Sequence, residues 1–137
     1  MSAGDYLLAA LLVGIGGGVG SVARWGVRML TLRLVAAKGG ERLSEESDPW
    51  TTVLANVLAC FVLGLVVSRF GSAGGSVELV YLMLAVGFCG GLSTLSTAAL
   101  DVVDLVRRRS FSIALAYLML SAGTGMAALW LGMVLAA

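Results

Sequence analysis

Hydrophobic residues fall into four long stretches that make up most of the chain, and short polar segments separate them. The stretches cover about residues 6–35, 50–69, 78–106 and 111–135. Each one is as long as the roughly 20 residues that an α-helix needs to cross a bilayer. The pattern therefore predicts an all-α integral membrane protein, a single transmembrane domain over residues 1–137 with four transmembrane helices.

Composition supports the membrane class and excludes several functions. Of the 137 residues, 59% are hydrophobic and 12% are charged, whereas an ordinary soluble domain is about 45–50% apolar and about 25% charged. The chain has no histidine and a net charge of +1, which excludes imidazole chemistry and argues against a nucleic-acid partner. Cys60 and Cys89 lie within apolar runs and are expected to be small buried hydrophobes. No constellation of residues supports an enzyme.

Glycines in the first stretch predict close helix contacts. Their spacing does not meet the G-x-G-x-x-G pattern of a dinucleotide-binding loop. Gly14 with Gly18 and Gly16 with Gly20 are instead pairs of small residues four positions apart, which let two helix backbones approach closely in a membrane. We expect dense contacts between helices, including contacts between subunits.

The basic residues are concentrated on one side of the predicted membrane. With four spans, the loop after the first span and the turn after the third share a side, which carries seven of them: Arg28, Arg33, Lys38, Arg42, Arg107, Arg108 and Arg109. The opposite side, where both termini lie, carries Arg69. The positive-inside rule then predicts cytoplasmic loops and two termini outside the cell membrane.

Asn56 lies within the second apolar stretch. An amide at membrane depth must find a hydrogen-bond partner or line a cavity. Two interpretations stay open: an interhelical hydrogen bond, worth about 0.6 kcal/mol on average in membranes, or a position on the wall of a pore.

The third stretch carries three glycines and four hydroxyl residues near its middle, over residues 87–97. Gly90 and Gly91 weaken the helix, and a break there would free backbone carbonyls, which are tolerated at membrane depth where protein, water or an ion satisfies them. The hydroxyls could donate to an anion and the carbonyls could bind a cation. The alternative is a kinked helix whose hydroxyls bond back to their own carbonyls.

Three segments resemble motifs of the Fluc (CrcB-type) fluoride channel family. They are GGVGSVARW at residues 17–25, WTTVLAN at 50–56 and GFCGGLST at 87–94. The resemblance implies an antiparallel dimer with two fluoride pores along the subunit interface, giving passive fluoride export and fluoride resistance. It also implies a structural sodium ion, not transported, held by the backbone carbonyls of Gly90 and Ser93 in the broken third helix.

The same resemblance implies roles for individual side chains. Arg24 would lie at a vestibule, and Asn56 would line the pore. The rest of the anion path maps to positions in the third and fourth spans: Thr94, Leu95, Ser96, Thr97, Ala98, Tyr117 and Ser121. Asp101 matches an acidic position of the family, with aspartate in place of glutamate.

The departures from the family pattern include two pore positions, because Leu95 and Ala98 stand where the family has pore phenylalanines. Together with the one-sided basic residues, this predicts one half of a heterodimer whose oppositely oriented partner supplies the aromatic rings. A non-conducting assembly or regulatory subunit is the alternative. A small multidrug exporter would need a carboxylate in the first span, and the segment from Tyr6 to Ala23 contains none.

Overall fold

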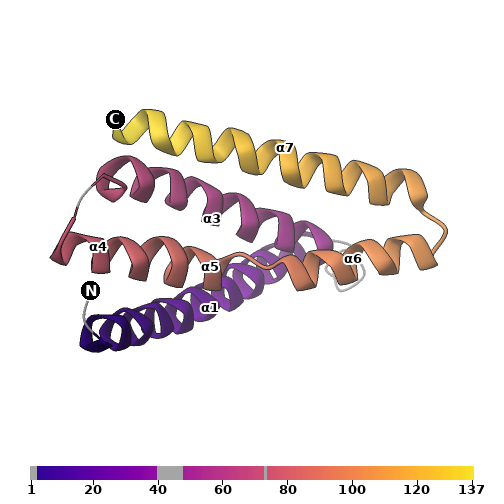
Figure 1. Ribbon diagram of the computed structural model, residues 1–137. Coiled ribbons are helices and arrows are strands. Elements are labelled where there is room, and N and C mark those ends of the chain that lie inside the picture. Colours follow the sequence, from indigo (N-terminus) through magenta and orange to yellow (C-terminus); the bar gives the residue numbers. More distant parts are fainter. Residues whose placement is uncertain (1–2, 40–47, 73) are drawn as a thin grey trace.

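The computed structural model describes residues 3–39, 48–72 and 74–137 and is helical almost throughout (Figure 1). Three spans are continuous helices: α1 (Ala3–Gly39), α3 (Asp48–Phe70) and α7 (Phe111–Ala136). The third span consists of α4 (Ser76–Tyr81), the π-helix η1 (Leu82–Phe88), α5 (Cys89–Leu92) and α6 (Leu95–Arg107). In the described part of the chain, four helical segments are long and apolar enough to cross a membrane, which confirms the predicted all-α architecture.

The helix ends agree with the predicted spans except in the first one. Helix α1 continues to Gly39, so its amphipathic end extends four residues beyond the expected end at residue 35. Most of the polar loop expected after it, including Arg42, lies outside the described residues. Figure 1 shows the two termini at one end of the bundle and the α6–α7 turn at the other, as an even number of spans requires.

Helices α3 and α7 lie side by side (Figure 1), and each helix has a glycine where the two backbones meet. A Cβ at Gly64 would collide with the carbonyl of Leu129, and a Cβ at Gly132 would collide with the carbonyl of Phe61. The two backbones are therefore in direct contact, as small residues permit in membrane helices. At the end of the pair, Nε of Arg69 donates to the carbonyl of Ala136 at 2.9 Å.

Helix α1 packs against η1 and α5 through a second set of glycines. A Cβ at Gly16 would collide with the carbonyl of Met83, and one at Gly20 with the carbonyl of Phe88. The close approach predicted for this pair is thus present, and its partner is the third span of the same chain. A Cβ at Gly14 or Gly18 would meet nothing within 4 Å among the described residues, so the contact between subunits expected for that pair stays a prediction.

The third span is interrupted in its middle, as predicted, although the break lies after the glycine pair. Gly90 and Gly91 are helical, and the extended residues are Ser93 (φ −77°, ψ 160°) and Thr94 (φ −153°, ψ 114°). Gly91 is needed for packing, because a Cβ there would collide with the carbonyl of Gly17. Thr94 then starts α6 as its N-cap, with the hydroxyl accepting from the N–H of Thr97 at 3.3 Å.

Candidate functional site

The break in the third span is held by Asn56 on α3. Its Oδ1 accepts from the N–H of Thr94 at 2.7 Å, and its Nδ2 donates to the carbonyl of Thr94 at 3.3 Å. The interhelical hydrogen bond, one of the two interpretations of Asn56, is therefore confirmed. An amide nitrogen carries two hydrogens, so a place on a pore wall is compatible with this pairing and stays a prediction.

Arg24 on α1 supports the neighbouring peptide unit. Its Nη1 donates to the carbonyl of Ser93 at 3.2 Å, and the side chain is half-buried. The last four carbonyls of a helix have no donor within that helix, and the carbonyl of Ser93 follows the end of α5. Hydrogen bonds with a charged donor contribute about 1.5–3 kcal/mol, so Arg24 on α1 stabilises the break in addition to Asn56 on α3.

The hydroxyl residues after the break form a small network around Thr94. Its Oγ1 lies 3.0 Å from Oγ1 of Thr97 and 3.3 Å from Oγ of Ser96. Thr94 is 8% exposed, whereas Ser96 and Thr97 are exposed. Leu95 is 86% exposed, so its side chain is not packed within this chain.

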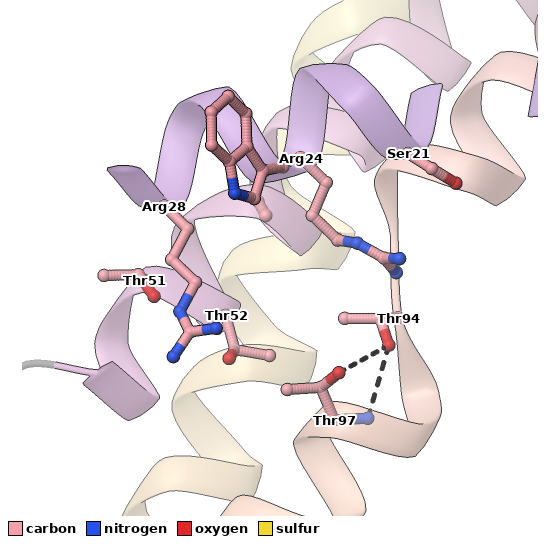
Figure 2. A pocket seen from close by; sticks show the side chains of 9 residues that line it. Ser21, Arg24, Arg28, Thr51, Thr52, Thr94 and Thr97 are labelled. Carbon is pink, nitrogen blue, oxygen red and sulfur yellow. Dashed lines mark hydrogen bonds between the residues drawn. The ribbon is translucent and has the colours of Figure 1, made fainter. Parts of the chain in front are cut away.

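A cavity of about 260 Å³ lies beside the break (Figure 2). Its lining consists of Ser21, Arg24, Trp25, Arg28, Thr51, Thr52, Ala55, Thr94 and Thr97. Among the residues that the structure describes, this lining has two guanidinium groups, five hydroxyls and no carboxylate. The cavity is therefore suited to an anion that keeps part of its water, because water occupies about 30 Å³ per molecule.

Sequence reasoning identified only part of this lining. Arg24 was expected at a vestibule and Thr94 and Thr97 in the anion path, whereas Trp25, Arg28 and the α3 residues of the lining were not expected. One signal for Arg28 was available in the sequence. Arg28 follows Arg24 by four positions, and residues four positions apart share a helix face. Nothing in the sequence indicated that the start of α3 would reach that face.

Two other expected pore residues, Tyr117 and Ser121, are not part of the cavity lining. Tyr117 on α7 is 0% exposed, and its hydroxyl donates to Oδ2 of Asp101 at 3.0 Å. Its ring centroid is 6.1 Å from that of Trp50, so it joins α3, α6 and α7 inside the bundle. Ser121 is half-buried one turn further along α7. A pore role for either residue stays a prediction.

Other expected site residues border open space. Gly90 is exposed, and a Cβ there would meet nothing within 4 Å. Ala98 is half-buried on the same helix as Leu95. The described residues contain no group of three His, Cys, Asp or Glu side chains that could hold a metal, and Cys60 and Cys89 are free thiols.

Four membrane-spanning helices, a broken third span and a cationic, hydroxyl-lined cavity define an integral membrane protein of the anion-transport class. The chain belongs to the CrcB-like protein family, described as Camphor Resistance (CrcB), whose family model matches residues 11–133. It is 37% identical over 131 residues to the "Fluoride-specific ion channel FluC" of Rhizobium leguminosarum bv. trifolii (strain WSM2304), covering 93% of this chain and 94% of the relative. It is also 38% identical over 125 residues to "Fluoride-specific ion channel FluC 2" of Rhodococcus jostii (strain RHA1), covering 91% and 96%.

Proposed function

We propose that this chain is a subunit of a fluoride-specific channel that lets fluoride leave the cell passively and so gives fluoride resistance. The observation that carries the proposal is the cavity with Arg24 and Arg28 beside the break at Ser93 and Thr94. Both curated relatives described above carry the name of a fluoride-specific ion channel. Ion channels are not enzymes, and no catalytic group is required.

The chemistry of the lining fits a small, strongly hydrated anion. A pathway must replace the water of fluoride with oriented donors, and the five hydroxyls, the Asn56 amide and two guanidinium groups supply them. Guanidinium charge within low-dielectric walls raises the local concentration of anions. The cavity would therefore collect fluoride at the level of the break.

A second subunit would complete the pathway. Leu95 is 86% exposed, and Ser96 and Thr97 on the same turn are exposed as well, so the described residues do not cover these three positions of the expected anion path. An antiparallel dimer would cover it. Seven basic residues on one side against one on the other favour a single orientation, so the partner is a homologous subunit of opposite orientation, and both termini of this chain lie outside.

A structural sodium ion is part of the proposal, held by the carbonyls of Gly90 and Ser93. In a continuous helix the N–H of Thr94 would bond to the carbonyl of Gly90, but here it donates to Asn56, and the carbonyl of Gly90 accepts a long hydrogen bond from Oγ of Ser93 at 3.5 Å. Hard cations prefer oxygen ligands, and Gly90 borders open space where a second subunit could bring further carbonyls. The carbonyl of Ser93 already accepts from Arg24, so sodium would use its second lone pair.

Fluoride efflux from liposomes tests the proposal. We expect fluoride to leave vesicles that contain this chain together with its partner, and chloride to stay inside the same vesicles. Efflux from this chain alone would instead favour a homodimer. If the pair assembles but its flux is unaffected by any change at Asn56, Thr94 or Thr97, the chain is a non-conducting assembly subunit, a second candidate that the aliphatic residues at positions 95 and 98 favour. No fluoride flux from either sample would reject the proposed function.

A further inference from the structure

The turn between α6 and α7 carries three consecutive arginines, Arg107, Arg108 and Arg109, at the end of the bundle opposite the two termini (Figure 1). All three side chains are exposed. Among the residues that the structure describes, none of them pairs with a carboxylate, and residues 105–137 contain no aspartate or glutamate. Like charges on neighbouring residues repel each other, so this turn holds three positive charges that an anion would stabilise.

The backbone of the turn favours glycine at the position of Arg109. The N–H of Ser110 donates to the carbonyl of Leu105 and the N–H of Arg109 donates to that of Val106, both at 2.9 Å. This pair of hydrogen bonds is the Schellman motif, in which the residue after the C-cap is usually glycine because its φ is positive. Arg109 has φ 57° and is the one residue other than glycine with a positive φ in the described part of the chain.

Neither the helix dipole nor the orientation requires an arginine at position 109. The dipole favours a cation near the end of α6, and the two arginines before it already supply one. With glycine at position 109, six basic residues would still face one across the membrane. The guanidinium group of Arg109 therefore stands at a strained position for a reason outside the chain's own folding.

Exposed apolar side chains lie next to the arginines on both helices. Val106 is on the last turn of α6, and Phe111 is the first residue of α7, followed by Ile113 and Leu115; all four are exposed. A free anion would contact the guanidinium groups alone. A lipid would place its headgroup on the arginines and its acyl chains against these apolar side chains, so the surface fits an anionic amphiphile.

We propose that Arg107, Arg108 and Arg109 bind the phosphate headgroup of an anionic phospholipid in the leaflet that the turn faces. The planar guanidinium group binds phosphate through two parallel N–H donors. In the proposed orientation this leaflet is the cytoplasmic one, whose anionic lipids attract basic segments beside a membrane span. The site uses no residue of the cavity, so the inference is independent of fluoride conduction.

Such a lipid would hold the half of the third span that the chain itself packs least. No residue of α6 is buried in the described chain, and α6 is joined to α7 by the hydrogen bond from Tyr117 to Asp101 at 3.0 Å. A headgroup on the three arginines would fix the far end of α6 at the membrane surface. The helix would then be held at both ends, by the Asn56–Thr94 pair at its start and by the lipid at its end.

Native mass spectrometry of the purified full-length chain tests the site without any measurement of flux. The protein is offered phosphatidylglycerol and phosphatidylcholine with identical acyl chains, and we expect it to retain phosphatidylglycerol in preference. Arg109→Gln and Arg109→Gly should each weaken that binding about fivefold, which corresponds to about 1 kcal/mol for each basic residue near an anionic surface. Inorganic phosphate at the concentration of the lipid should not displace it.

Two comparisons separate the site from folding and from general charge. Glycine relieves the positive φ and glutamine does not, so Arg109→Gly should melt a few degrees above Arg109→Gln while binding the lipid equally weakly. Arg33→Gln is the matched control for charge, because Arg33 is exposed on α1 and its loss also removes one positive charge from the same side. This variant should keep the affinity of the unchanged chain.

Four results would overturn the proposal. Equal retention of the two lipids would show that the headgroup charge is not recognised, and displacement by inorganic phosphate would show that the ligand is a free anion. Equal weakening by Arg33→Gln and Arg109→Gln would mean a diffuse surface charge in place of a site. Unchanged binding by Arg109→Gly would show that the guanidinium group of Arg109 does not contact the lipid.

Discussion

One side chain, that of Asn56, pairs with both backbone polar groups of Thr94, accepting from its N–H at 2.7 Å and donating to its carbonyl at 3.3 Å. Thr94 has extended dihedral angles, so Asn56 provides the pairing that a neighbouring β-strand would otherwise give. Irregular backbone at membrane depth is tolerated where protein satisfies it. This pair explains how an all-helical chain holds two extended residues in the middle of a span.

Replacing Asn56 with alanine should destabilise the protein as well as reduce flux. The change leaves the N–H of Thr94 without its partner, and an unsatisfied buried group costs about 1–3 kcal/mol. We expect a loss of about 2–3 kcal/mol in the free energy of unfolding, measured by denaturation in detergent. Thr31→Ala is the control, since its hydroxyl bonds to Val27 within its own helix at 2.8 Å. Equal effects of the two changes would contradict the role of Asn56.

The glycines between α3 and α7 should not tolerate even one methyl group. Alanine at Gly64 or Gly132 would place a Cβ against the backbone of the facing helix, and such overpacking costs about 1–3 kcal/mol. Alanine at Gly123 on α7 is the matched control, because a Cβ there meets nothing within 4 Å. Thermal unfolding of the purified variants measures the difference. Similar melting temperatures for all three would show that the helices separate more easily than the close contact implies.

The orientation can be measured by cysteine labelling after Cys60 and Cys89 are changed to alanine. We expect Ser72→Cys to react with an impermeant maleimide from outside the cell, and Ser112→Cys to react only after the membrane is permeabilised. The reason is the seven-to-one distribution of basic residues. Labelling of both sites in intact cells would mean that the chain inserts in both orientations.

A large side chain at Gly90 should prevent assembly of the pair and leave the single chain folded. A Cβ at this position meets nothing within the described chain, so Gly90→Leu introduces no internal clash. It would fill the space proposed for sodium and the second subunit. Crosslinking of the co-expressed pair, with and without sodium, measures assembly, and Gly123→Leu controls for the added bulk. Normal assembly of the Gly90→Leu pair in sodium-free buffer would exclude the ion site.

In the proposed heterodimer, the two pores that we expect should respond differently to changes in the two chains. Leu95 and Ala98 lack the positive ring edge of phenylalanine, and a lost contact of about 1.4 kcal/mol slows passage about tenfold. Asn56→Ala in this chain and the corresponding change in its partner should therefore reduce fluoride flux unequally. Equal partial losses, or strong flux from this chain alone, would contradict the asymmetry.

The spans could be predicted because hydropathy alone determines which segments enter a membrane, and the break could be predicted because Gly90, Gly91 and four hydroxyl residues crowd one segment. The position of the break could not be predicted from helix propensity. Gly91 stays helical because it packs against Gly17, and the chain opens where Asn56 and Thr94 satisfy its polar groups. These are tertiary contacts between residues far apart in sequence.

The cavity was harder to predict for the same reason. Thr51 and Thr52 follow Pro49 at the start of α3 and suggest no more than a polar helix end. They line the cavity only because α3 packs beside Arg28 of α1. The glycine pair also suggested that a break would leave backbone carbonyls free to bind a cation. One of these carbonyls, that of Ser93, already accepts a hydrogen bond from Arg24.

The two-residue interruption at Ser93 and Thr94 has a mechanical consequence. The half of the third span before it is fastened to α1 by glycine contacts, and the half after it is fastened to α7 through Asp101 and Tyr117. Any shift of α1 relative to α7 is therefore concentrated at two peptide units and is not shared along a ladder of helical hydrogen bonds. Two side chains on different helices, Arg24 and Asn56, hold that joint from outside the third span by hydrogen bonds, so its stiffness is adjustable by single substitutions that leave every helix intact.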